Sequence, residues 1–115
     1  MHELSIAISL VEAAQEEARN HASTAVYAVH LRLGALAGVV KDALLFSYDF
    51  ATQGTPLEGS RLIVEEVPVI VLCPVCRERR PIRSPQLFCC AVCGAPAGDV
   101  LQGRELEVTA LEIAP

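Results

Sequence analysis

Apolar and polar residues follow a helical period in two stretches of this chain. Near the start, apolar residues recur three and four positions apart while glutamates fall between them, and the recurring set is Leu4, Ala7, Ile8, Val11, Ala14 and Ala18. This spacing predicts an amphipathic helix over about residues 4–20. A second helix is expected from Asp42, whose side chain can cap it, to about Thr52, and Gly54 and Pro56 would end it.

Three other stretches have the period of two that is typical of strands. The first, at 26–34, should place one set of side chains in the core, namely Tyr27, Val29, Leu31 and Leu33. The second runs over 61–72, where Pro68 marks a sheet edge or an exit, since proline cannot donate to a ladder. The third is a returning strand within 103–113, with apolar residues at Leu106, Val108 and Ala110.

The order of these elements predicts an α+β fold, with two helices on a small three-stranded mixed sheet and an inserted zinc-ribbon-like module. A strand, helix and strand in succession favour a right-handed crossover and hence a parallel pair. The returning strand should pair antiparallel with the strand that enters the inserted segment. We therefore expect an α/β domain from residues 1–72 plus 101–115, and a module from residues 73–100.

Composition narrows the class of protein. The 115 residues suit one domain with a small subdomain, and 52% of them are apolar but only 4% aromatic, so the core must consist mainly of Leu, Ile, Val and Ala. A net charge of −5 disfavours a protein whose main task is to bind nucleic acid. No apolar run approaches the roughly 20 residues of a membrane span, and no export signal is evident. We expect a cytoplasmic protein that binds neither nucleic acid nor membrane.

All five cysteines lie in the segment 73–100, together with four of the seven prolines. Cys73 and Cys76 form one CxxC pair, and Cys90 and Cys93 form a second. Two such pairs are typical of a zinc ribbon, in which four thiolates surround one ion, although iron accepts the same set. A site closed by four protein ligands should be structural rather than catalytic. Cys89 is the surplus thiol, and the spacing favours Cys90 over it.

Two other interpretations of this segment stay open. The CxxC pairs could be disulfides or a thiol oxidoreductase site, which the missing export signal and the two matched pairs disfavour. Alternatively, a zinc ribbon could bind nucleic acid through the arginines Arg77, Arg79, Arg80 and Arg83. We favour a solvated loop for them, because Glu78 stands in their midst and the chain is acidic. No catalytic triad, phosphate loop or paired-carboxylate site is present, so we expect a protein that is not an enzyme.

The first three residues, Met1, His2 and Glu3, offer a second metal site. The terminal amine, the His2 amide nitrogen and the His2 imidazole can close two chelate rings on one cation, and the Glu3 amide can complete a square. Planar nitrogen donors suit Ni(II) and Cu(II). The alternative is an ordinary surface histidine, which is the reading we give to His21 and His30.

Four sequence features together resemble the HypA/HybF family of nickel metallochaperones for NiFe hydrogenase maturation. They are MHELSIA, LLFSYDFATQGTPLEGSRL, the CxxC pairs with FxCxxCG at 88–94, and GRELEV. The resemblance implies that the Met1 amine, the His2 ring and amide, and the Glu3 backbone or side chain hold transferable Ni(II). It also implies that Cys73, Cys76, Cys90 and Cys93 hold structural zinc.

The same resemblance implies partners. Nickel would pass to or from the GTPase HypB before it reaches the NiFe hydrogenase large subunit precursor, and in some members the urease pathway draws on the same pool. One departure concerns Val40, Lys41 and Asp42, where many relatives carry an acidic residue and then proline. Help with nickel from a carboxylate of that loop is therefore not expected here. A homodimer through the apolar run VPVIVL is left open.

Overall fold

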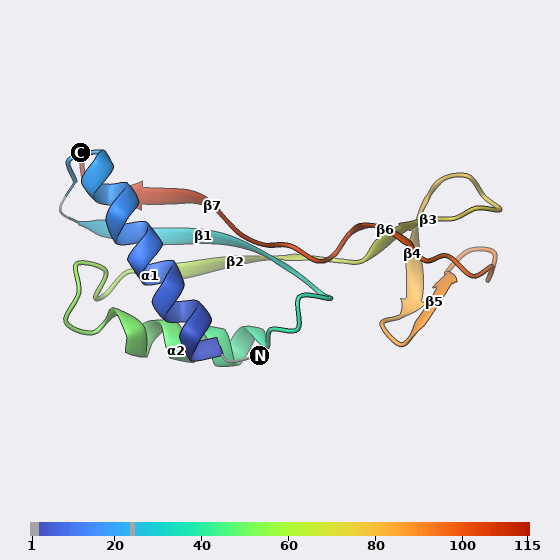
Figure 1. Ribbon diagram of the computed structural model, residues 1–115, viewed down its shortest axis with the longest axis horizontal. Coiled ribbons are helices and arrows are strands. Elements are labelled where there is room, and N and C mark those ends of the chain that lie inside the picture. The colour runs from blue at the N-terminus through green and yellow to red at the C-terminus, as the bar shows by residue number, and fades with distance from the viewer. Residues whose placement is uncertain (1–2, 24) are drawn as a thin grey trace. The chain divides into compact units, whose positions relative to one another are not determined.

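The computed structural model describes residues 3–23 and 25–115. The chain folds into two compact units (Figure 1). The first, which we call the α/β unit, comprises Met1–Arg32, Val39–Glu65 and Glu107–Pro115. The second, which we call the cysteine unit, comprises Leu33–Gly38 and Glu66–Leu106. The predicted module, 73–100, lies within the cysteine unit. Among the described residues, no helix is long and apolar enough to cross a membrane.

The α/β unit contains two helices and a three-stranded sheet, as the α+β prediction requires. The helices are α1 (Glu3–Asn20) and α2 (Lys41–Thr52), and the strands are β1 (Val26–Gly34), β2 (Arg61–Val67) and β7 (Leu106–Ile113). The strand order is β2-β1-β7, with β1 and β2 running in one direction and β7 in the other (Figure 1). The mixed sheet and the parallel pair across α2 are therefore confirmed.

Helix α1 packs on the sheet through a narrow stripe of small residues, namely Ala7, Val11, Ala14 and Ala18. Their spacing of four, three and four residues keeps them on one face, and short side chains let the helix backbone approach the sheet closely. Leu4 and Ile8, which the pattern also assigned to this face, are 42% and 44% exposed and lie at its edges. The helix is thus where it was predicted, but its buried stripe is narrower.

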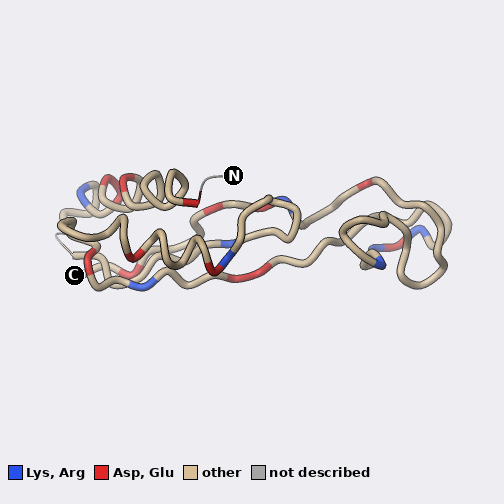
Figure 2. Tube along the Cα trace, turned by 90° about the horizontal axis from the view of Figure 1, so that it is seen from below, with Lys and Arg blue, Asp and Glu red and all other residues tan. Residues whose placement is uncertain are grey.

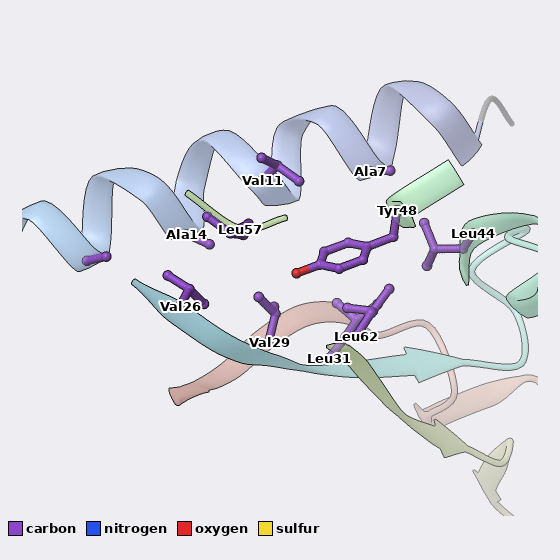
Figure 3. Packing of buried hydrophobic residues seen from close by; sticks show 11 residues of the cluster. Ala7, Val11, Ala14, Val26, Val29, Leu31, Leu44, Tyr48, Leu57 and Leu62 are labelled. Atoms are coloured by element: carbon purple, nitrogen blue, oxygen red, sulfur yellow. The ribbon is translucent and has the colours of Figure 1, made fainter. Parts of the chain in front are cut away.

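Helix α2 contributes Leu44, Tyr48 and Thr52 to the core (Figure 3). The predicted cap by Asp42 is wrong, because the helix begins at Lys41 after Val40 and has no side-chain cap at that position. Instead, the backbone N–H of Val40 donates to the Glu3 carboxylate at 3.2 Å. This bond connects the first residue of α1 to the start of α2.

The predicted alternation of β1 fails at Tyr27. This side chain is 58% exposed, whereas Ala28 and Val29 are both fully buried. Two consecutive buried residues shift the alternation by one position, so that Val29 and Leu31 face the core but Tyr27 faces solvent (Figure 3). Sequence periodicity assumes an unbroken pleat and therefore missed this shift.

The predicted pairing of the returning strand is also wrong. β7 lies beside β1, and not beside the strand that enters the cysteine segment. The expected strand over 61–72 is in fact two strands, because it breaks at Pro68 into β2 and β3 (Ile70–Leu72). It is β3 that pairs antiparallel with a strand leaving the cysteine segment, β6 (Asp99–Gln102).

The cysteine unit holds a four-stranded sheet in the order β5-β4-β3-β6, in which β4 is Arg79–Ser84 and β5 is Leu87–Cys90. Every pairing in this sheet is antiparallel. Its apolar core is small and consists of buried Val69, Val71 and Ala97, with Leu36, Ile82 and Val100 packed against them. So little buried apolar surface is a weak basis for stability, and a further crosslink is expected.

Candidate metal centre

The fold brings together the four cysteines of the two CxxC pairs, Cys73, Cys76, Cys90 and Cys93, whose sulfur atoms all lie within 4.8 Å of one another. The Sγ atoms of Cys73 and Cys93 are 3.5 Å apart. In a tetrahedral zinc site with bonds of about 2.3 Å, neighbouring sulfurs lie about 3.8 Å apart. The cluster therefore fits one zinc ion, with no position left for a substrate.

Both CxxC pairs form the same backbone turn. In the first, the N–H of Arg77 donates to the carbonyl of Cys73 at 2.7 Å, and the N–H of Cys73 donates to the backbone carbonyl of Glu78 at 3.0 Å. In the second, the N–H of Gly94 donates to the carbonyl of Cys90 at 2.9 Å. The N–H of Cys90 correspondingly donates to the carbonyl of Ala95 at 2.8 Å. Two matched turns of this kind are what a zinc ribbon requires.

Backbone amides point at the sulfurs within these turns. The N–H of Cys76 donates to Cys73 Sγ at 3.3 Å, and the N–H groups of Val92 and Cys93 donate to Cys90 Sγ at 3.4 and 3.5 Å. Such bonds stabilise a thiolate, which is the form that binds metal. The sulfurs that accept these bonds belong to the first cysteine of each pair, and both of these cysteines are fully buried.

The two thiols of the second CxxC pair differ in pKa. Amide hydrogen bonds, first that from Cys93, lower the pKa of Cys90 to about 6. At Cys93 the hydrogen bond from Ala95 lowers the pKa, but the neighbouring thiol of Cys73, burial and the other cysteines outweigh it and raise the pKa to about 11. A divalent ion supplies the positive charge that this group of sulfurs lacks.

Cys89 stands outside the cluster. It is partly buried in β5, and Cys89 and Pro96 form an isolated antiparallel bridge. Cys90, the next residue along the strand, is fully buried and is the one that joins the other three cysteines. All five cysteines are free thiols in the structure.

Most of the arginines assigned to a solvated loop lie in a strand instead; arginines and lysines are blue along the chain in Figure 2. Arg79, Arg80 and Arg83 belong to strand β4. The Arg80 guanidinium lies 2.6 Å from the Glu78 carboxylate, and its hydrogen bond with Cys76 is the main reason that the pKa of Arg80 is raised. Arg79 donates to the Gln102 side chain at 3.2 Å. The loop assignment was wrong for these three arginines because the polar sequence RRPIRS has no alternation of apolar residues from which a strand could be predicted.

The predicted nickel site lies mostly beyond what the structure shows, because Met1 and His2 are outside the described residues. Glu3, its third member, is the first residue of α1, and its carboxylate accepts the hydrogen bond from Val40. The other two histidines are hydrogen-bonded to glutamates, His21 to Glu17 at 3.0 Å and His30 to Glu112 at 2.7 Å. Within the described part of the chain, the cysteine cluster is the one group of ligands gathered for a metal.

Comparison with known proteins decides the family. The family described as "Hydrogenase/urease nickel incorporation, metallochaperone, hypA" matches residues 1–113. The chain belongs to the HypA family. A protein of Chloroflexus aurantiacus named "Hydrogenase maturation factor HypA" is 53% identical over 112 residues, which cover 97% of this chain and 98% of that protein. A HypA protein of Desulfosudis oleivorans is 40% identical over 114 residues, covering 98% of both.

Solved structures support the fold. The solution structure of the Ni metallochaperone HypA from Helicobacter pylori superposes with a TM-score of 0.67 at 19% identity, over 98% of this chain and 97% of that one. A second solution structure of a HypA protein gives a TM-score of 0.71 at 19% identity, over 99% and 97% of the two chains. At this level of identity the likeness concerns the fold alone.

Proposed function

We propose that this chain is a non-catalytic, cytoplasmic nickel metallochaperone. It binds Ni(II) at its N-terminus and, with a HypB-type GTPase, delivers it to the large subunit precursor of a NiFe hydrogenase. The observation that carries this proposal is the match to the HypA family over residues 1–113, which includes both the N-terminal residues and the cysteine cluster. The nickel is cargo, and the zinc is part of the architecture.

The nickel donors are the Met1 amine, the His2 imidazole and amide nitrogens, and Glu3. We assign the fourth position to the Glu3 backbone amide, because its carboxylate is already engaged by the N–H of Val40 at 3.2 Å. Glu3 is also the first residue of α1, which places its backbone amide next to His2 in the chain. Four nitrogens in a plane suit Ni(II), and loading must release protons.

The zinc site has a different task. Cys73, Cys76, Cys90 and Cys93 hold the ion, which crosslinks the two turns of the cysteine unit and is worth on the order of 10 kcal/mol in such modules. Four protein ligands close its coordination, so it neither exchanges with the nickel cargo nor activates a substrate. The gathering of all four sulfurs in one cluster supports this role over that of a thiol oxidoreductase.

Nickel titration calorimetry of protein with its native start tests the proposal. His2→Ala, and separately acetylation of the Met1 amine, should each lower the nickel affinity at least a hundredfold, because the first removes the imidazole donor and the second removes the amine donor, and each loss opens a chelate ring. Zinc content and circular dichroism should not change. His21→Ala is the matched control, since His21 lies at the other end of α1 and pairs with Glu17. Unaltered nickel affinity in both N-terminal variants would refute the proposed site.

A further inference from the structure

Two phenylalanines of α2 face solvent instead of the core. Phe46 is 77% exposed and Phe50 is 60% exposed, although the whole chain has only three phenylalanines. They are four residues apart and therefore lie side by side on the helix. The opposite face of α2 packs against the rest of the α/β unit, because Leu44, Tyr48 and Thr52 are buried there. Each of the two faces of α2 thus presents large apolar side chains, and one of them has no partner within the described chain.

Acidic residues flank this aromatic pair. Asp42 lies one turn before Phe46, and Asp49 lies beside Phe50 in the sequence, and both carboxylates are exposed. Lys41, at the first position, is the sole basic residue of α2. We call Phe46, Phe50, Asp42 and Asp49 the α2 patch. Its chemistry is complementary to an apolar groove with a rim of lysines or arginines.

The α2 patch lies on the helix whose start is bonded to Glu3, the one proposed nickel-site residue within the described part of the chain. The hydrogen bond from the Val40 N–H to the Glu3 carboxylate holds the start of α2 beside the start of α1. Phe46 follows Val40 by fewer than two turns of helix, which is about 9 Å at 1.5 Å per residue. A protein docked on this patch would therefore lie near Glu3 and the start of α1.

We propose that the α2 patch is the docking surface for the protein that exchanges nickel with the N-terminus, and that this partner presents an apolar groove lined at its rim with basic side chains. The inference rests on the proposed function, which it deepens by assigning the partner's surface. A second copy of this chain fits less well. Self-pairing of the patch would place one acidic rim against another in a chain of net charge −5.

Binding of the purified HypB-type GTPase, measured by calorimetry without nickel, tests this surface. The double variant Phe46→Ala/Phe50→Ala should raise the dissociation constant at least 30-fold, as expected when two central aromatic anchors are removed. Tyr27→Ala is the matched control, because Tyr27 is an aromatic residue of the same unit that is 58% exposed on β1, and it should change the constant less than threefold. Zinc content and nickel affinity should stay at the wild-type level in both.

A second pair of variants examines the charge complementarity. Asp42→Lys/Asp49→Lys should weaken GTPase binding at low salt and flatten its dependence on ionic strength, whereas Asp42→Asn/Asp49→Asn should give a smaller effect in the same direction. These changes leave both phenylalanines in place. They therefore separate the rim from the apolar centre of the patch.

Three results would overturn the docking surface. The first is equal binding of the Phe46/Phe50 and Tyr27 variants, and the second is no binding of the wild-type chain. The third is a concentration-dependent dimer that disappears in the phenylalanine variant while GTPase binding persists, which would assign the patch to a second copy. Failure of the nickel site has a different signature, namely loss of nickel binding with intact GTPase binding, and it would leave the docking surface standing.

Discussion

Arg77 and Gly94 occupy the same position in the two CxxC turns and share a left-handed backbone, with φ values of 59° and 79°. The turn requires this conformation so that the N–H of the residue after the second cysteine can reach the carbonyl of the first. Glycine adopts it without strain, but a residue with a Cβ does not. The second turn therefore has the natural residue, and the first carries strain at Arg77.

Arg77→Gly should stabilise the cysteine unit by about 1 kcal/mol relative to Arg77→Ala. Both changes remove the same charged side chain, but only glycine relieves the backbone, so the pair isolates the conformational effect. The measurement is a urea titration at one fixed free zinc concentration, followed by the amide NMR signals of the cysteine unit. Equal midpoints for the two variants would show that the left-handed turn costs nothing at Arg77.

At the level of elements, α2 is fastened to the segment that follows it by one buried polar contact. Tyr48 lies among the core residues (Figure 3) and is only 1% exposed. Its hydroxyl is 2.7 Å from Ser60 Oγ. Burial is the main cause that raises the pKa of Tyr48 above its ordinary value of 10.0; the hydrogen bond with Ser60 opposes the rise, and the nearby charge of Asp49 adds to it. The fold thus favours the neutral phenol.

This raised pKa predicts a loss of stability in alkali. The stabilisation is fully present below the unfolded pKa of about 10 and disappears as the pH rises through the folded pKa, at up to about 1.4 kcal/mol per pH unit. Tyr48→Phe should lower the free energy of unfolding by about 1 kcal/mol near neutral pH, because Ser60 loses its buried hydrogen-bond partner. Since the variant has no phenol to ionise at position 48, the difference in free energy of unfolding between wild type and variant should shrink above about pH 10. Urea unfolding of both proteins across this range checks the prediction, which a gap independent of pH would contradict.

The elements themselves were more predictable than their pairing. The stripe Ala7, Val11, Ala14 and Ala18 identified α1, because helix period is a local property of the chain. The shift at Ala28 and Val29 and the position of β7 beside β1 depend on contacts between distant segments, which a local pattern does not contain. The hydrogen bond between Glu3 and Val40 is equally non-local. For the candidate site, spacing singled out the four cysteines that gather, but not the left-handed residue that each turn requires.

On the scale of the whole molecule, the two units differ in what holds them together. The α/β unit has an extended core that draws residues from both helices and from the sheet, including Val11, Leu31, Leu44, Tyr48 and Leu62 (Figure 3). The core cluster of the cysteine unit is much smaller, with Val69, Val71 and Ala97 as its buried residues. We therefore expect apolar burial to hold the first unit, and a zinc ion at the four cysteines to be needed for the second.

Removal of zinc with a strong chelator should therefore unfold one unit and spare the other. Because both helices belong to the α/β unit, the helical circular dichroism signal should persist, while backbone amides between Glu66 and Leu106 lose protection in hydrogen exchange. Cys73→Ser should reproduce this state, and Cys89→Ser, the matched control outside the cluster, should retain zinc and full protection. Nickel binding at the N-terminus should survive chelation of zinc, since its donors lie in the unit that stays folded. Simultaneous loss of the helical signal would mean instead that the two units unfold cooperatively and that the zinc stabilises both.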